Sequence, residues 1–223
     1  MLVFIIAMNN EAEPVIDQMK IESDRTVCGK RVVCGKLFGM ETGVVICGVG
    51  KVNAACGTQY AIDCLNAKAI INLGVAGGLN NRLKIGGLYR MDAVVQYDFD
   101  LTQINGTEIG TLDECKNNYL PLFGGDCEDP VYKLATGDRF NDSKDDYRLL
   151  TNVLNADVRD MECGAIAQVC MHAEIPCLSY KIISDLAGNG STTEQFSANL
   201  ELCFKTLKRE LKNIADSIKG IEI

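Results

Sequence analysis

Short apolar runs alternate along the chain with segments in which apolar residues recur every three or four positions. The runs predict strands at residues 2–7, 31–33, 43–48, 69–73, 88–97, 157–160 and 177–183, several of them rich in Val and Ile as central strands require. The periodic segments predict helices at residues 11–20, 52–65, 144–153, 164–173 and 193–218. The alternation predicts the α/β class, and we expect residues 1–223 to form a single domain.

Two segments need separate comment. The last predicted helix carries a long apolar stripe that begins at Phe196 and ends at Ile218, which predicts core packing. Residues 103–129 show no clear period, so we expect a long excursion from the sheet. Excursions of this length in compact domains are typically lids or interface arms.

Acidic and small residues directly follow three of the predicted strands. Met8 and Glu11 follow the first strand, residues 74–78 follow the strand 69–73, and Ser184 and Asp185 follow the last strand. Ligands of open α/β sheets bind beyond the carboxyl ends of the strands. We therefore expect these segments to converge if the strands are parallel neighbours.

A fourth segment extends this candidate site. Residues 157–160, the helix 164–173 and the strand 177–183 predict a βαβ unit, whose right-handed crossover places its two strands near each other in one sheet. Glu162 and Asp185 are then expected at the same edge, each just past its strand.

Each acid also has a purely structural explanation when taken alone. Glu11 and Glu162 lie in the first turn of a predicted helix, where the helix dipole stabilises a carboxylate, and Asp185 is placed to cap a turn. Three acids at three carboxyl ends together favour a ligand site. The glycines of residues 74–78 match neither the dinucleotide nor the P-loop pattern, and fit either a flat ring lying against the backbone or a tight turn.

Charge and apolar content narrow the class of partner. The formal charge is −8 and no cluster of Lys or Arg forms a basic stripe, which argues against a nucleic-acid partner and favours a small, weakly charged ligand. No apolar run approaches the roughly 20 residues of a membrane-spanning helix, so we expect neither a membrane segment nor a signal peptide.

The cysteines and the histidine argue against disulfides and metal. The eleven cysteines are odd in number and most lie in apolar runs, so we expect reduced thiols in a cytoplasmic protein. No two cysteines are two to four residues apart, and the only histidine, His172, has no paired ligand nearby, so we predict no metal site.

Seven short blocks, taken in order, resemble a known family. They are AMNNEAE (7–13), GVGKVNAA (48–55), NLGVAGG (72–78), DFDLT (98–102), TGDRF (136–140), DME (160–162) and ISD (183–185). Together they resemble the successive blocks of the methylthioadenosine/S-adenosylhomocysteine nucleosidases, a family of the nucleoside phosphorylase superfamily. No single block is decisive, whereas the ordered set covers most of the chain and is specific.

The resemblance implies a three-layer α/β/α fold with a mixed, partly barrel-like central sheet. It also implies a role for individual positions: Asp185 donates a proton to purine N7, Glu11 activates the attacking water, and Glu162, with Met161, holds the ribose hydroxyls. Phe140 matches the ring that stacks on the base, and the backbone of Asn141 matches the position that reads the edge of the base. Other positions implied to bind substrate are Met8, Val75, Ala76, Gly77, Asp160, Lys181 and Ser184.

The resemblance further implies a homodimer, in which part of residues 103–129 lines the 5′ pocket of the partner. The expected partners are therefore a small-molecule purine nucleoside, water as co-substrate and a second copy of the chain. No metal or organic cofactor is expected, because a proton handles the leaving group.

The chemistry of the reaction explains these residue types independently. A glycosidic bond to a purine breaks with oxocarbenium character on the sugar, so the base must be protonated while the ribosyl cation faces negative charge. Phosphorylases of the superfamily carry a Gly-Asp-Pro-x-Arg type segment after the first strand, whereas this chain has Met8-Asn9-Asn10-Glu11 there. A carboxylate repels phosphate and suits water, which predicts hydrolysis. A phosphate-dependent purine nucleoside phosphorylase and a non-catalytic nucleoside-binding module remain the alternatives.

The chain departs from the family at several positions that bear on the substrate. Lys181 stands where Arg is frequent, Asp160 where Glu is common, and Arg139 and Asn141 replace small or apolar residues beside the base. Residues 188–193 offer no clear aromatic to close over a 5′-thioalkyl group. The sequence leaves open both the 5′ substituent and the choice between adenine and a 6-oxo purine.

Overall fold

The computed structural model describes residues 1–123 and 132–218 of the chain. Its strands are β1 (Leu2–Ile6), β2 (Met19–Val27), β3 (Lys30–Leu37), β4 (Met40–Ile46), β5 (Ala69–Gly78), β6 (Leu88–Gln96), β7 (Leu120–Pro121), β8 (Tyr132–Thr136), β9 (Val158–Asp160) and β10 (Cys177–Leu186). Its helices are α1 (Asn9–Ile16), α2 (Lys51–Leu65), α3 (Thr102–Asn105), α4 (Lys144–Arg148), α5 (Cys163–His172) and α6 (Thr192–Ile218), and a π-helical turn, η1 (Leu149–Val153), continues α4.

One mixed sheet organises these elements. Its strand order is β10-β6-β8-β9-β5-β1-β4-β3-β2, and β7 pairs with β6. An additional pairing of β10 with β5 closes β5, β10, β6, β8 and β9 into a five-stranded barrel, while β1, β4, β3 and β2 extend the sheet from β5. The mixed, partly barrel-like sheet implied by the family resemblance is thus confirmed.

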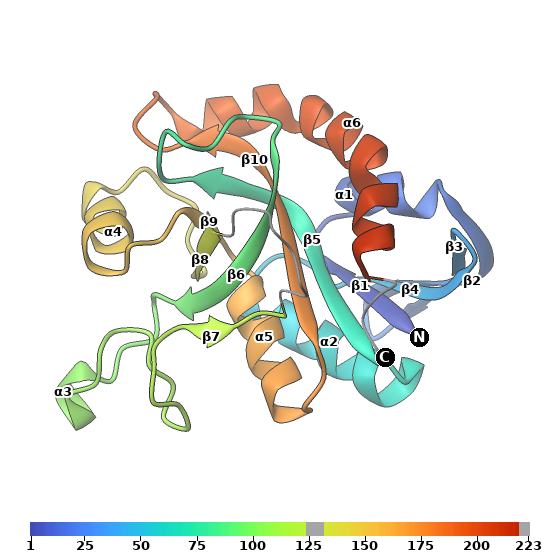
Figure 1. Ribbon diagram of the computed structural model, residues 1–223, viewed down its shortest axis with the longest axis horizontal. Coiled ribbons are helices and arrows are strands. Elements are labelled where there is room, and N and C mark those ends of the chain that lie inside the picture. The colour runs from blue at the N-terminus through green and yellow to red at the C-terminus, as the bar shows by residue number, and fades with distance from the viewer. Residues whose placement is uncertain (124–131, 219–223) are drawn as a thin grey trace.

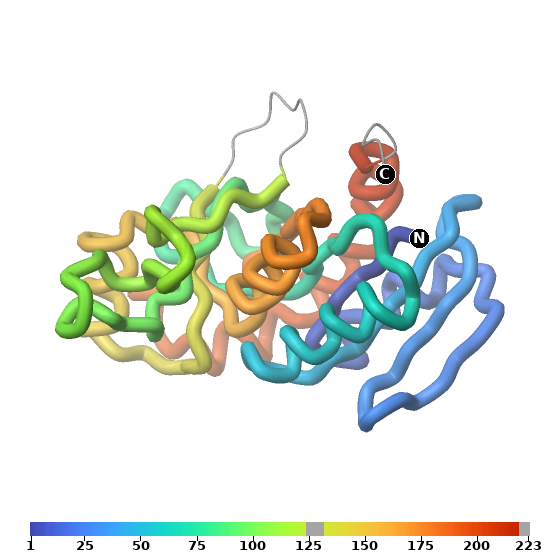
Figure 2. Tube along the Cα trace, turned by 90° about the horizontal axis from the view of Figure 1, so that it is seen from below, coloured from blue at the N-terminus to red at the C-terminus, as the bar shows by residue number. Residues whose placement is uncertain are grey.

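Helices cover both faces of the sheet (Figure 1). Helices α1 and α6 contact each other on one face, and α2 and α5 contact each other on the opposite face, where Figure 2 shows them side by side. The sequence of β1 explains the layering, because alternate residues of a strand point to opposite faces. Phe4 and Ile6 belong to the core cluster that includes Leu207 of α6, whereas Val3 and Ile5 belong to the cluster that includes Ile166 of α5.

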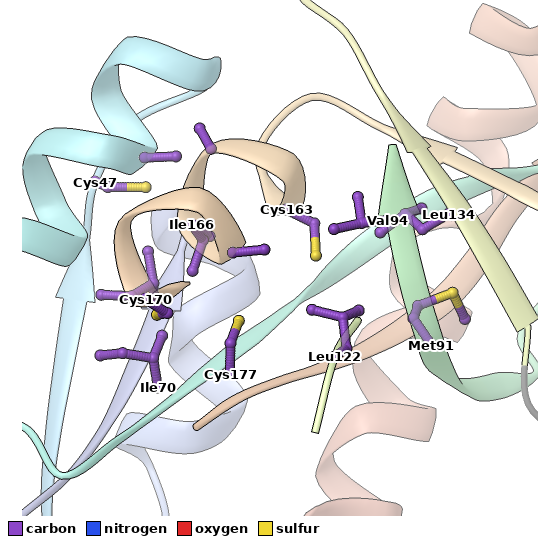
Figure 3. Packing of buried hydrophobic residues seen from close by; sticks show 14 of the residues in the cluster. Cys47, Ile70, Met91, Val94, Leu122, Leu134, Cys163, Ile166, Cys170 and Cys177 are labelled. Atoms are coloured by element: carbon purple, nitrogen blue, oxygen red, sulfur yellow. The ribbon is translucent and has the colours of Figure 1, made fainter. Parts of the chain in front are cut away.

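Several cysteines act as small apolar core residues. Cys163 and Cys170 of α5 lie close to Cys177 at the start of β10, and all three side chains are buried (Figure 3). Burial raises the pKa of the Cys163 thiol well above its ordinary value, which keeps the thiol protonated. Ten cysteines are free thiols, and Cys127 lies outside the described residues.

The first predicted helix was too long. Helix α1 ends at Ile16, and residues from Met19 onward form β2 instead of continuing a helix 11–20. Strand β2 lies at the end of the strand order and is exposed along almost its whole length. Its residues therefore lack the apolar alternation that marks a half-buried strand.

Strands β5 and β10 are longer than predicted. Strand β5 runs through the glycine segment to Gly78, so of the two alternatives for residues 74–78 the tight turn is excluded. Strand β10 likewise continues through Ser184 and Asp185 to Leu186. Strand β8 was not predicted, because Lys133 and Thr136 leave it without the continuous apolar run that marks β1. Residues 103–123 hold most of α3 and all of β7, and residues 124–129 of the excursion lie outside the described residues.

The predicted βαβ unit was also wrong in its strand directions. Strand β9 pairs antiparallel with β5, whereas β10 pairs parallel with β5, so β9 and β10 lie on either side of β5 and run in opposite directions. The reason is that β9 is very short and continues the parallel run of β6 and β8 around the barrel. In the described parts of the chain no helix is both long and apolar enough to cross a membrane.

Candidate active site

A gap in the pairing of β5 forms the floor of the candidate site. Along one edge of β5, strand β1 pairs with Ala69 to Asn72 and strand β9 pairs only with Gly77 and Gly78. Between these two partners the backbone N–H of Val75 donates to Glu11 Oε1 at 2.8 Å. A side chain thus takes the place of a strand, because a buried backbone donor needs an acceptor.

Glu11 is held in the gap by the first turn of α1. Its Oε2 accepts the backbone N–H of Met8 at 3.1 Å, which closes a capping box with the residue that precedes the helix. The side chain is buried, and burial raises the pKa of Glu11 although the Val75 N–H and the charge of Lys181 act in the opposite direction. A carboxylate with a raised pKa is a better proton acceptor for a water molecule.

Glycines leave room for the carboxylates of the site. A Cβ atom at position 74 would stand 3.0 Å from Glu11 Oε1, and a Cβ atom at position 77 would stand 3.0 Å from Asp185 Oδ1. Distances this short are rare for real Cβ atoms, so any larger residue would displace the acids. The glycine segment is therefore neither a turn nor a phosphate loop.

Glu162 lies at the start of α5, immediately after β9. Its Oε1 accepts the backbone N–H of Gly50, at the start of α2, at 2.9 Å. Burial raises the pKa of Glu162 to about 7, and the negative charge of Asp160 acts in the same direction. Glu162 can therefore hold or release a proton near neutral pH.

Lys181 and Asp160 form a buried ion pair next to these acids. Lys181 Nζ lies 2.8 Å from Asp160 Oδ2, and the two side chains are 2% and 1% exposed. The hydroxyl of Thr136 and the backbone N–H of Cys163 also donate to Asp160. Burial alone would lower the pKa of Lys181, but the charge of Asp160 raises it, so the lysine stays protonated. Lys181 supplies the positive charge that allows several carboxyl groups to be buried together.

Asp185 is the next-to-last residue of β10, and one of its carboxyl oxygens accepts no hydrogen bond from the described residues. Ser184 Oγ donates to Asp185 Oδ2 at 2.8 Å, whereas Asp185 Oδ1 has no hydrogen-bond partner among residues 1–123 and 132–218. The guanidinium of Arg159 is 3.9 Å from that free oxygen. Burial raises the pKa of Asp185, and Asp185 is only 2% exposed. The free oxygen is thus placed to carry and deliver a proton.

These groups line one cavity of about 470 Å³, a volume suited to a small organic ligand. Most of the residues predicted for the site line it: Met8, Glu11, Val75, Ala76, Gly77, Phe140, Asp160, Met161, Glu162, Ser184 and Asp185. Lys181 is not part of the lining and acts through Asp160. Asn141 is not part of the lining either. Its carbonyl oxygen accepts a hydrogen bond from Arg159, and Arg159 does line the cavity.

Phe196 and Arg159 are among the cavity-lining residues that the sequence did not assign to the site. Phe196 was predicted to pack in the core as part of the α6 stripe, but it lines the cavity and meets Phe140 edge to face, with ring centroids 5.5 Å apart. Arg159 was not predicted as a site residue at all. The signal available in the sequence was that a charged residue directly precedes the predicted site residue Asp160. Among the described residues no group of three His, Cys, Asp or Glu side chains is arranged to hold a metal ion.

Comparison with known proteins places this arrangement in a class. Residues 2–216 match the family model described as the phosphorylase superfamily, so the chain belongs to that superfamily. A 5′-methylthioadenosine/S-adenosylhomocysteine nucleosidase from Geobacillus thermodenitrificans is 31% identical over 85% of this chain and 86% of its own length. Within the superfamily the chain belongs to this nucleosidase family.

Solved structures agree with the fold. Futalosine hydrolase from Helicobacter pylori superposes with a TM-score of 0.87 at 24% identity, over 96% of this chain and 97% of that one. The nucleosidase from Colwellia psychrerythraea, solved in complex with adenine, has a TM-score of 0.87 at 25% identity, over 97% of this chain and 94% of that one.

Proposed function

We propose that the chain hydrolyses the N-glycosidic bond of 5′-methylthioadenosine, S-adenosylhomocysteine or a related purine nucleoside that carries a 5′ thioether. Membership of the family makes the chain a hydrolase of N-glycosyl bonds, and the relatives are named for these substrates. The observation that carries the proposal is the convergence of Glu11, Glu162 and Asp185, far apart in sequence, on one cavity.

The roles of the three acids follow from their surroundings. Asp185, with its raised pKa and unused Oδ1, donates the proton to N7 of the departing base. Glu11, held rigidly by two backbone N–H groups, accepts a proton from the attacking water. Glu162 binds the ribose hydroxyls, and the acidic end of the cavity faces the positive charge that develops on the sugar.

Water is favoured over phosphate as the nucleophile. Glu11, Asp160 and Glu162 place three carboxyl groups at the sugar end, and Lys181, the neighbouring cation, is already paired with Asp160. A phosphate ion there would meet like charge, and the charge of Lys181 is already balanced by Asp160.

A second copy of the chain is expected to complete the site. Val49 lines the cavity yet is 48% exposed, and Val52 and Ile104 are 75% and 81% exposed. We propose that these residues pack in a homodimer in which part of residues 103–129 closes the partner's 5′ pocket. Light scattering of the wild-type protein should give twice the mass of one chain, and Val52→Glu should give the mass of one chain. A monomeric wild type would overturn this part of the proposal.

One experiment tests the reaction class. The protein is incubated with purine nucleosides with and without phosphate, and the products are identified by mass spectrometry. Free base with free sugar in phosphate-free buffer supports hydrolysis. A sugar 1-phosphate formed only with phosphate would establish a phosphorylase, and ligand binding without any product would establish a nucleoside-binding module.

A further inference from the structure

Arg159 is built into the wall of the cavity beside Asp185. Strand β9 places it opposite Gly77, and a Cβ atom at position 77 would stand 3.0 Å from Arg159 Nε and 3.2 Å from its Cγ. The side chain is only 12% exposed. Its Nη1 donates to the backbone carbonyl of Asn141 at 2.8 Å, and its Nη2 is 3.9 Å from Asp185 Oδ1. The guanidinium is therefore fixed between Asp185 and the backbone that follows Phe140, and both Asp185 and Phe140 line the cavity.

The positions of those two groups locate the guanidinium relative to a bound purine. Asp185 is the proposed proton donor to N7, and the substituent at C6 is the nearest exocyclic group to N7 on the purine ring. Asn141 directly follows Phe140, which lines the cavity. A side chain that bridges Asp185 and the Asn141 carbonyl would lie beside the C6 substituent of a purine whose N7 faces Asp185.

Arg159 offers hydrogen-bond donors to this part of the cavity. A guanidinium carries five N–H donors and no acceptor. Among the described residues, the Asn141 carbonyl is the only hydrogen-bond acceptor of Arg159. Its Nη2 keeps donors free toward the cavity, and the Asn141 carbonyl already accepts one hydrogen bond, from Nη1.

We propose that Arg159 makes the site select purine nucleosides with an oxygen at C6 over those with an amino group, an inference that rests on the proposed nucleosidase function. A 6-oxo group accepts a hydrogen bond from Nη2. A 6-amino group would instead point its own N–H donors at the N–H donors of Arg159. The site is buried, and an unpaired polar group there is costly. Electron density also moves into the base as the glycosidic bond breaks, and an oxygen at C6 carries part of it toward the cation.

The test compares 5′-methylthioinosine with 5′-methylthioadenosine, which differ only at C6. We expect the wild-type protein to hydrolyse the 6-oxo substrate with a kcat/KM at least about 10-fold higher, the effect of one hydrogen bond to a charged group. Arg159→Met should shift the ratio of the two kcat/KM values by about 10- to 100-fold toward the amino substrate. Arg159→Lys, which keeps the charge but loses the planar fork, should fall between the two.

The ratio separates selectivity from general damage, because a misfolded or poorly activated variant loses both substrates alike. Arg148→Met, at a 70% exposed position outside the cavity, serves as the control and should leave both rates unchanged. Wild-type preference for the amino substrate, or an unchanged ratio in Arg159→Met, would overturn the inference. If neither nucleoside is turned over, the proposed function fails, and calorimetric binding of hypoxanthine and adenine to wild type and Arg159→Met still decides the role of Arg159.

Discussion

Lys181 and Asp160 face each other inside the closed barrel, with Nζ and Oδ2 2.8 Å apart and both side chains removed from solvent. Strand β10 provides the lysine and the end of β9 provides the aspartate. The pair therefore joins two strands that are not hydrogen-bonded neighbours, beneath the floor of the cavity.

Removing one partner of this pair should destabilise the fold strongly. Lys181→Met leaves Asp160 buried without its counter-ion and should lower the free energy of unfolding by about 3–5 kcal/mol, measured by urea denaturation. Combining Lys181→Met with Asp160→Asn should recover part of this loss. Lys205→Met, which removes an exposed helix pair with Glu201, is the control and should change stability little. Equal stability of Lys181→Met and wild type would contradict a structural role for the pair.

Asp185→Asn should abolish release of the base while the fold stays intact. The amide keeps the shape of the carboxyl group but cannot deliver a proton to N7, so kcat should fall by about 10²-fold or more. Circular dichroism and the unfolding midpoint should match the wild type. Asp145→Asn, at a 91% exposed position, should retain full activity. Turnover near the wild-type rate in Asp185→Asn would remove Asp185 from the mechanism.

The pKa of Glu162 predicts a pH dependence of stability. Its value of about 7 in the folded protein lies above the ordinary value of 4.5. Between these two values the folded protein keeps a proton that the unfolded chain has released, so stability falls as pH rises through this window. Glu162→Gln removes this effect. The free energy of unfolding of Glu162→Gln, relative to that of the wild type, should therefore rise by about 1–3 kcal/mol from pH 5 to pH 8.

Urea denaturation of both proteins at the two pH values provides the measurement. Glu13→Gln, at an exposed position of α1, is the matched control and should follow the wild-type curve. Parallel stability curves for wild type and Glu162→Gln would show that Glu162 has the same pKa in the folded and unfolded chain.

The sequence predicted the carboxylates of the site better than the sheet that holds them. Glu11, Glu162 and Asp185 could be found because each lies at the carboxyl end of a strand or within a few residues after it. This relation does not depend on the length or direction of the strand. The direction of β9 could not be found, because a three-residue strand gives no pattern that distinguishes parallel from antiparallel pairing.

Periodicity also could not separate the two uses of an apolar helix face. Leu207 and Leu211 are buried in the core, whereas Phe196, on the same stripe, reaches past the end of the sheet into the cavity. Which residues of the apolar stripe pack in the core depends on how far α6 extends beyond the sheet. That extent is a property of the tertiary structure. The cavity position of Arg159 depends in the same way on the closure of the barrel.

The exposed strand β2 has a consequence for the protein in concentrated solution. Within the described residues β2 pairs only with β3, so its other edge offers unpaired backbone groups that a foreign strand could extend. Its sequence places Lys20, Glu22, Asp24 and Arg25 along that edge. Addition of a neutral strand would strip water from these charges, so the same lack of apolar alternation that hid β2 from prediction protects the chain from fibrillar growth.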